Sequence, residues 1–225
     1  MRREENRHLH IAIDGPAGAG KSTVARRVAE KLGIAYLDTG AMYRVIAYKA
    51  LSEGISPQNE EIVTSLAHSA KISFGQRDKP SVYCNGEDVT SQIRSSDVSR
   101  AVSVIASYQG VREYLVGLQR RVAAQGSVVM DGRDIGTFVL PLAEVKIFLT
   151  ASAEERARRR HFENIQTGKV SSFEEVLADI EKRDRLDSER IYAPLKPAKD
   201  AIILDTTGLT EEEVIEKIVK IVREA

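Results

Sequence analysis

Near its amino terminus the chain reads Gly15-Pro16-Ala17-Gly18-Ala19-Gly20-Lys21-Ser22, followed by Thr23. A glycine, four further residues and then Gly-Lys-Ser is the spacing of a loop whose backbone N–H groups surround a polyphosphate. Glycines let such a loop turn inward, because they have no Cβ to oppose positive φ angles. Lys21 would reach the β and γ phosphates of a nucleoside triphosphate, and the Ser22 hydroxyl would hold a Mg²⁺ that bridges them. The segment therefore predicts a phosphate-binding loop.

The flanking residues support this interpretation. The segment 10–13 has the composition of a short buried strand. Apolar residues then recur at helical spacing as far as Gly33, a typical helix end: Val24, Ala25, Val28, Ala29 and Leu32. A strand, a glycine loop and the N-terminus of a helix form an anion-binding site. This context favours a nucleotide site over the alternative, a flexible Gly/Ala linker.

Composition excludes several classes of protein. The 225 residues indicate one core with an inserted or mobile subdomain. Lys and Arg total 33, as do Asp and Glu, so no overall basic field would recruit nucleic acid or a membrane surface. Cys84 is the single cysteine and forbids an internal disulfide. No segment resembles a targeting signal or a membrane span. We therefore expect a cytoplasmic monomer that binds neither nucleic acid nor membrane.

Further apolar segments extend the α/β pattern. Strands are expected at 34–37, 127–130, 145–149 and 201–204, with helices between them. Together with 10–13 they predict an α/β fold, a five-stranded parallel sheet with helices on both faces. A β-rich stretch interrupts this rhythm, and Asn85-Gly86 is a strong hairpin signal. We expect one P-loop domain over 1–225, with an inserted subdomain at about 62–100 and a lid at about 153–169.

Two predicted strands end in polar segments. Residues 38–44 and 131–137 follow strands directly and should face the phosphate loop, because ligands of parallel α/β sheets lie beyond the carboxyl ends of strands. Arg44 is a candidate for a second phosphate group, although an ordinary surface arginine fits equally well. Asp131 ends an apolar strand and could orient Mg²⁺, with Arg133 beside it as a second phosphate ligand. The alternative is a turn with solvated charges.

Two expected helices carry clustered arginines. Arg156, Arg159 and Arg160 stand at i, i+3 and i+4 and could present three guanidinium groups on one helix face. A lid that closes over phosphates and a solvated helix face are both consistent with this run. Arg183, Asp187 and Arg190 form a second stripe on the helix expected at 172–190. Either a structural ion pair or recognition of ribose and phosphate would explain it.

Three motifs together resemble the family of bacterial cytidylate kinases: Asp-Thr-Gly-Ala-Met-Tyr-Arg at 38–44, Asp-Gly-Arg-Asp-Ile-Gly-Thr at 131–137, and Arg-Asp-x-x-Asp-x-x-Arg at 183–190. The resemblance covers nearly the whole chain. It implies that Arg44, Arg133 and Arg190 hold a monophosphate and that Asp187 and Arg183 hold the ribose. It also implies that Ser103, Arg112 and Asp134 read cytosine. Thr39 and Tyr43, within the first motif, are further candidates for the acceptor site.

The resemblance implies transfer of the γ-phosphoryl group from ATP·Mg²⁺ to CMP or dCMP. Lys21, Arg133, Arg159 and Asp131 would act on the transferred group, and Arg156 and Arg160 on ATP. Positioning and charge neutralisation dominate such a reaction. Two rivals remain, a P-loop kinase for another monophosphate or a small alcohol, and a GTPase-like switch. The chain has no Asn-Lys-x-Asp guanine-reading motif, which counts against the switch.

Overall fold

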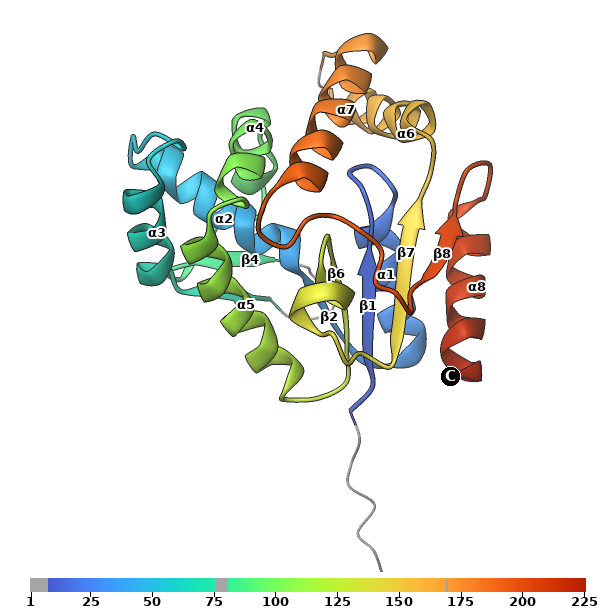
Figure 1. Ribbon diagram of the computed structural model, residues 1–225. Helices are drawn as coiled ribbons and strands as arrows, with labels where there is room; N and C mark the ends of the chain where they lie inside the picture. Colours follow the sequence, from blue (N-terminus) through green and yellow to red (C-terminus); the bar gives the residue numbers. More distant parts are fainter. Residues whose placement is uncertain (1–7, 76–80, 169) are drawn as a thin grey trace, which may run out of the picture. The chain divides into compact units, whose positions relative to one another are not determined.

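The computed structural model describes residues 8–75, 81–168 and 170–225. The chain divides into two compact units (Figure 1). One unit joins the residues up to Leu37 to Arg120–Ala225, and the other is Asp38–Gln119. The division falls within helix α5 (Gln109–Ala123). The subdomain expected at 62–100 lies inside the second unit.

The first unit is built on a five-stranded parallel sheet flanked by helices, which confirms the predicted fold class. The strand order is β2-β6-β1-β7-β8. The strands are β1 (His10–Asp14), β2 (Ala35–Asp38), β6 (Val128–Gly132), β7 (Val145–Thr150) and β8 (Ile202–Asp205). β1 is central and is buried on both faces, which explains its continuous apolar sequence. The parallel pairing brings the carboxyl ends of β6, β1 and β7 to one edge of the sheet (Figure 1).

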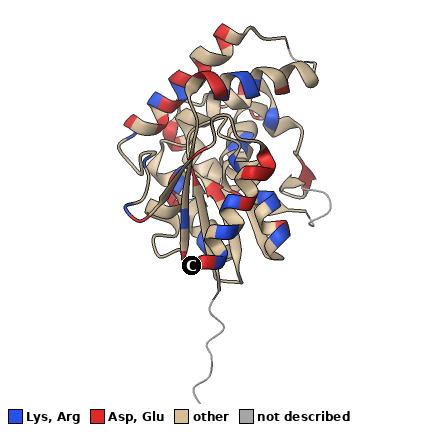
Figure 2. Ribbon diagram, turned by 90° about the vertical axis from the view of Figure 1, so that its right-hand side faces the viewer, with Lys and Arg blue, Asp and Glu red and all other residues tan. Residues whose placement is uncertain are grey.

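Helices α1 (Lys21–Leu32) and α8 (Glu211–Glu224) cover β1 and β7. Their apolar faces form the core of this unit, in which Val28, Ile147 and Ile215 are buried. Gly33 ends α1 in the left-handed conformation, with φ of 68°. On the outer face Lys31 pairs with Glu212, with 2.6 Å between Nζ and Oε1. Figure 2 shows acidic and basic residues on the same helices of the structure. Helix α1 therefore packs its apolar face on the sheet and turns its charged face outward, directly after the phosphate loop.

Helices α6 (Ala153–Gln166) and α7 (Phe173–Glu189) pack against each other through Ala157, Val176 and Ile180. Ser172 and Glu175 form a capping box at the start of α7. The helix ends at Glu189, so the expectation that Arg190 continues its stripe is wrong. Arg190 is extended, with φ of −60° and ψ of 138°, and its Nε donates to the Ala193 carbonyl at 2.6 Å.

The second unit combines helices with a small antiparallel sheet. Its elements are α2 (Thr39–Ser52), α3 (Glu60–Ser69), β3 (Ile72–Phe74), β4 (Val82–Cys84), β5 (Glu87–Asp88), η1 (Gln92–Arg94), α4 (Ser96–Ile105) and the first part of α5. β4 pairs with both β3 and β5. Asn85 and Gly86 have φ of 53° and 88°, as a two-residue hairpin turn requires. The predicted hairpin is confirmed.

A π-helical turn, η2 (Ile135–Val139), follows β6 where the sequence suggested only a polar segment. Its N–H groups reach back five residues, from Val139 to Asp134 at 3.1 Å and from Leu140 to Ile135 at 2.7 Å. Such turns are rare and often occur at functional sites. Within the described ranges, no helix has the length and apolar character needed to cross a membrane.

Candidate active site

The phosphate loop connects the end of β1 to the start of α1. Gly15 has φ of 149°, and a Cβ there would lie 2.0 Å from the carbonyl oxygen of Leu149. The loop therefore passes β7 too closely for any side chain at this position. Gly20 occupies the cap position of α1 and supplies no side-chain cap. The N–H groups of the first helical turn thus remain available to an anion, which the helix dipole favours.

Lys21 is buried in the first turn of α1. Its Nζ donates to the Pro16 carbonyl at 2.7 Å, which folds the side chain back over the loop. Burial, with the nearby Arg133 charge, lowers the pKa of Lys21 to about 7, although Asp131 and Asp187 oppose the shift. A phosphate would bring the negative charge that restores the ammonium form.

Asp131, near the end of β6, lies beside the loop. Its Oδ2 accepts from the Ser22 hydroxyl at 2.8 Å, and its Oδ1 accepts from the Tyr36 hydroxyl at 2.8 Å. Oxygen ligands of this kind suit Mg²⁺, which commonly combines one or two protein groups with substrate phosphates and water. Among the described residues, no three or more His, Cys, Asp or Glu side chains cluster as a metal site. The Ser22–Asp131 pair therefore fits a metal held jointly with nucleotide phosphates.

Arg133 and Asp187 form a largely buried ion pair, with 2.8 Å between Nε and Oδ2. Burial pushes the pKa of Asp187 upward, but the charge and hydrogen bond of Arg133, helped by Arg183, hold it below its usual value. Arg183 is half-buried, and its buried Nε has no hydrogen-bond partner among the described residues. Asp187 thus pairs with Arg133, which lies between β6 and η2, rather than with the neighbour four residues earlier on α7. The Nε–H of Arg183 is therefore a buried donor near the Arg133–Asp187 pair.

Asp134 and Arg190 approach each other in the same unit, with 3.3 Å between Oδ1 and Nη2. Both side chains are buried. Asp134 follows the strand that carries Asp131, and Arg190 follows the end of α7. The structure therefore brings residues from the second and third sequence motifs together at one edge of the sheet.

The three arginines of α6 have different surroundings. Arg156 is buried and donates to the Ala17 and Ala151 carbonyls at 3.0 and 2.9 Å. It also pairs with Asp184 at 2.7 Å. Arg159 binds Glu155 and Thr206, whereas Arg160 pairs with Glu163 at the surface. A single solvated face is therefore wrong for Arg156, because that side chain is enclosed between the phosphate loop and α7.

The second unit holds the other expected acceptor residues. Thr39 and Tyr43 are buried in α2, and Arg44 donates to the Ser99 hydroxyl at 3.0 Å. Arg112 is fully buried, donates to the Ala106 carbonyl at 3.1 Å, and lies over the Tyr43 ring at 5.5 Å. Ser103 is half-buried in α4. Arg44 is consequently not an ordinary surface arginine, and Arg44 and Arg112 each donate to an oxygen within this unit.

Comparison with known proteins identifies the family. The sequence profile described as Cytidylate kinase matches residues 11–224. The chain belongs to the cytidylate kinase family. It is 56% identical over 215 residues to a cytidylate kinase of Desulfitobacterium hafniense, covering 96% of this chain and 93% of that protein. It is 53% identical to a cytidylate kinase of Bacillus cytotoxicus, covering 98% of each.

Solved structures of other kinases share the fold of this chain. A gluconokinase from Sinorhizobium meliloti is similar at a TM-score of 0.52 with 15% identity, covering 96% of this chain and 92% of that one. A shikimate kinase from Bacteroides thetaiotaomicron is similar at 0.50 with 13% identity, covering 96% and 99%. At these identities the likeness concerns the fold alone.

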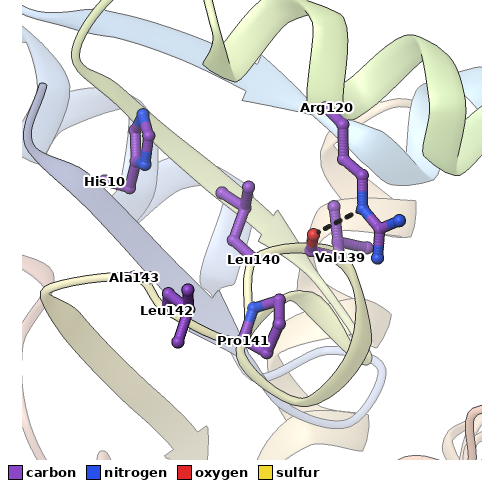
Figure 3. Close-up of a pocket in the computed structure, with 7 residues that line it drawn as sticks. All are labelled: His10, Arg120, Val139, Leu140, Pro141, Leu142 and Ala143. Atoms are coloured by element: carbon purple, nitrogen blue, oxygen red, sulfur yellow. Dashed lines mark hydrogen bonds between the residues drawn. The ribbon is translucent and has the colours of Figure 1, made fainter.

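A pocket of about 320 Å³ lies beside His10, the first residue of β1 (Figure 3). It is lined by His10, Arg120, Val139, Leu140, Pro141, Leu142 and Ala143. Arg120 donates to the Val139 carbonyl at 3.0 Å and so closes one side (Figure 3). None of the residues expected at the active site lines this pocket.

Three residues of the site were not predicted from the sequence. Tyr36 binds Asp131, Asp184 binds Arg156, and Ser99 binds Arg44. Asp184 is the second residue of the motif at 183–190 but received no role there, and nothing in the spacing of Ser99 marked it. Tyr36 stands two residues before the first motif and resembled an ordinary strand residue.

Proposed function

We propose that the protein transfers the γ-phosphoryl group of ATP to CMP or dCMP, giving ADP and CDP or dCDP. The observation that carries this proposal is the full-length similarity to cytidylate kinases, at 53–56% identity, in a chain with a complete phosphate loop. The first unit adds the buried Lys21 and, near it, Arg133, whose charge helps to lower the pKa of Lys21. Two anions can approach each other only where such cations offset their repulsion.

ATP would bind along the phosphate loop, residues 15–23. The loop N–H groups and the start of α1 would hold its phosphates, and Lys21 would follow the transferred group. Ser22 and Asp131 would hold Mg²⁺, which neutralises charge on the β and γ phosphates when bound. Tyr36 would keep the Asp131 carboxylate oriented. Arg156, Arg159 and Arg160 would assist on the ATP side, with Arg156 acting through its contact with the loop.

The acceptor monophosphate would bind to Arg44, Arg133 and Arg190, and its ribose to Arg183 and Asp187. Thr39, Tyr43, Ser103, Arg112 and Asp134 would complete the acceptor site. The carboxylate of Asp134 can accept from the cytosine amine, and Arg112 can donate to the cytosine acceptors. In-line attack by a phosphate oxygen requires no strong base, so the buried Asp187 has a binding role rather than a catalytic one.

The reaction class is tested by measuring ADP production with single acceptors. CMP, dCMP, UMP, AMP, GMP, shikimate and gluconate are each offered with ATP and Mg²⁺, and ATP alone is the control. We expect rapid ADP formation with CMP or dCMP. Preference for shikimate or gluconate would indicate an alcohol kinase. Slow hydrolysis independent of any acceptor would indicate a nucleotide switch.

We further propose that the enzyme works as a monomer in the cytoplasm, within pyrimidine nucleotide metabolism. The single cysteine, Cys84, supports a reducing compartment, because it leaves no partner for an internal disulfide. Size-exclusion chromatography with light scattering tests the oligomeric state.

A further inference from the structure

Asp14 is a buried carboxylate at the end of β1, directly before the phosphate loop. Its Oδ1 accepts from the N–H of Ile135 at 2.8 Å, and its Oδ2 accepts from the N–H of Gly136 at 2.7 Å. The side chain is 4% exposed. One carboxylate on β1 therefore holds two backbone donors that follow β6.

These two N–H groups open η2, and the first N–H groups of any helical turn lack partners within it. An aspartate just before a helix ordinarily accepts a hydrogen bond from those N–H groups. Asp134 occupies that position, yet its side chain makes no capping bond. Its Oδ1 instead faces Arg190, with 3.3 Å between Oδ1 and Nη2. Asp14 thus performs the capping that Asp134 would otherwise perform.

The local packing makes this arrangement tight. Asp14 pairs with Gly132 in the strand register, which places the ends of β1 and β6 side by side. A Cβ on Gly136 would lie 3.1 Å from Cδ of Lys146 and 3.4 Å from Oδ2 of Asp14. Little room therefore exists for η2 to shift while these contacts hold.

The charge state of Asp14 supports the double hydrogen bond. Burial raises the pKa of Asp14 to about 6, opposed by the N–H groups of Gly136 and Ile135. The Asp134 charge adds to the rise, and the Lys21 charge opposes it. The carboxylate is therefore mainly ionised at neutral pH, with both oxygens able to accept.

We propose that Asp14 is a positioning residue for base selection: by capping η2, it keeps the Asp134 carboxylate away from its own backbone and available to the cytosine amine. This inference rests on the proposed function, in which Asp134 reads cytosine. Without the cap, Asp134 turns back to satisfy the N–H groups of η2 and leaves the base. Asp14 thereby links the end of β1, directly before the phosphate loop, to recognition of the acceptor.

The test compares the wild type with Asp14→Asn, which replaces one acceptor oxygen with an NH₂ group facing an N–H. We expect kcat/KM for CMP to fall on the order of 10²-fold, the loss typical of a misplaced binding group. The fall for UMP is smaller, so the preference for CMP shrinks, while KM for ATP stays near the wild-type value. Thr137→Val is the matched control, because the buried Thr137 hydroxyl in η2 has no hydrogen-bond partner among the described residues. This control keeps the preference for CMP.

A double-mutant cycle separates positioning from general damage. If Asp14 acts through Asp134, adding Asp14→Asn to Asp134→Asn leaves the CMP-to-UMP ratio nearly unchanged. A further drop of that ratio in the double variant overturns the inference, as does an equal loss for CMP and UMP in the single variant. A wild-type enzyme that does not prefer CMP to UMP contradicts the proposed function itself. The preference of the wild type is therefore measured before any variant is made.

A second measurement applies if Asp14→Asn does not fold. Backbone hydrogen exchange at Ile135 and Gly136 is compared between the wild type and Asp134→Ala. We expect equal protection, because Asp14 supplies the cap. Faster exchange in Asp134→Ala would identify Asp134 as the cap and overturn the inference.

Discussion

The Arg156 guanidinium donates a hydrogen bond to the carbonyl oxygen of Ala17, with 3.0 Å between Nη1 and the oxygen. This contact joins the first turn of α6 to the middle of the phosphate loop. A Cβ on Gly18 would lie 3.1 Å from Cβ of Arg156, so helix and loop are in close contact there. Arg156 also pairs with Asp184 of α7. Any lid movement must therefore begin beyond Arg156, because the start of α6 is tied to the loop.

Hydrogen exchange tests this restriction on the lid. We expect residues 158–168 to exchange more slowly when ATP and CMP are both bound, because closure would exclude water from the phosphates. Residues 153–157 should be protected with and without nucleotides. Exchange across 158–168 that does not respond to nucleotides would refute the lid. A large change across 153–157 would show that the Arg156 contact breaks on closure.

Lys21→Ala should nearly abolish phosphoryl transfer while the fold is retained. In the proposed reaction Lys21 meets charge that develops on the transferred group, and loss of one preorganised donor typically costs about 2.7–4 kcal/mol of transition-state stabilisation. Steady-state kinetics with ATP and CMP measure the loss, and circular dichroism checks the fold. Lys31→Ala is the matched control, since Lys31 is on the same helix but pairs with Glu212 at the surface. Near-normal turnover of Lys21→Ala would contradict the assigned role.

Tyr36→Phe should raise the concentration of free Mg²⁺ that the enzyme needs, without unfolding the protein. The Tyr36 hydroxyl donates to Oδ1 of Asp131 at 2.8 Å, and loss of a partner that orients a metal-binding carboxylate typically costs about 10- to 100-fold in metal affinity or activity. Initial rates are measured against free Mg²⁺ at fixed ATP and CMP. Tyr48→Phe is the control, because the Tyr48 hydroxyl has no hydrogen-bond partner in the described part of the chain. If both variants show the wild-type Mg²⁺ requirement, Tyr36 does not orient Asp131.

Asp134→Asn should reduce kcat/KM for CMP more than for UMP. Cytosine offers an amine at C4 and acceptors at N3 and O2, whereas uracil offers an acceptor at C4 and a donor at N3. Replacing one carboxylate oxygen with a donor therefore removes a contact that only cytosine can make. Sites built on such hydrogen bonds can discriminate by about 10⁴–10⁵. Equal losses for CMP and UMP would mean that Asp134 does not read the base.

The stability of the protein should carry a pH signature of Asp14. Its pKa is raised from 3.8 to about 6 in the folded state, so the folded protein binds this proton more tightly than the unfolded chain does. The contribution to the free energy of unfolding is thus fully present below pH 3.8 and is lost as pH rises through about 6. Relative to Asp14→Asn, the wild type should gain about 2–3 kcal/mol between pH 7 and pH 4. Urea unfolding at both pH values measures the gap, and a gap independent of pH would contradict the prediction.

The fold was largely predictable from local patterns. Each buried strand of the large sheet appears as a short apolar run, and Gly33 and the Asn85-Gly86 pair marked a helix end and a hairpin. Boundaries differed by one or two residues, because the ends of helices depend on capping contacts as well as on composition. The π-helical turn η2 was not predictable, because its first N–H groups are held by Asp14 from a different strand.

The sequence by itself determined the phosphate loop, the parallel sheet and the family, because glycine spacing, apolar periodicity and short motifs act over a few neighbouring residues. Only the tertiary structure decided which charges pair. Arg133 binds Asp187, Arg156 binds Asp184, and Asp131 receives hydrogen bonds from Ser22 and Tyr36. The partners of each group lie on different elements, which the parallel sheet and its packed helices bring together within hydrogen-bonding distance. Spacing along the chain carries no record of such contacts, and burial makes each of them strong enough to set the charge and orientation of the site.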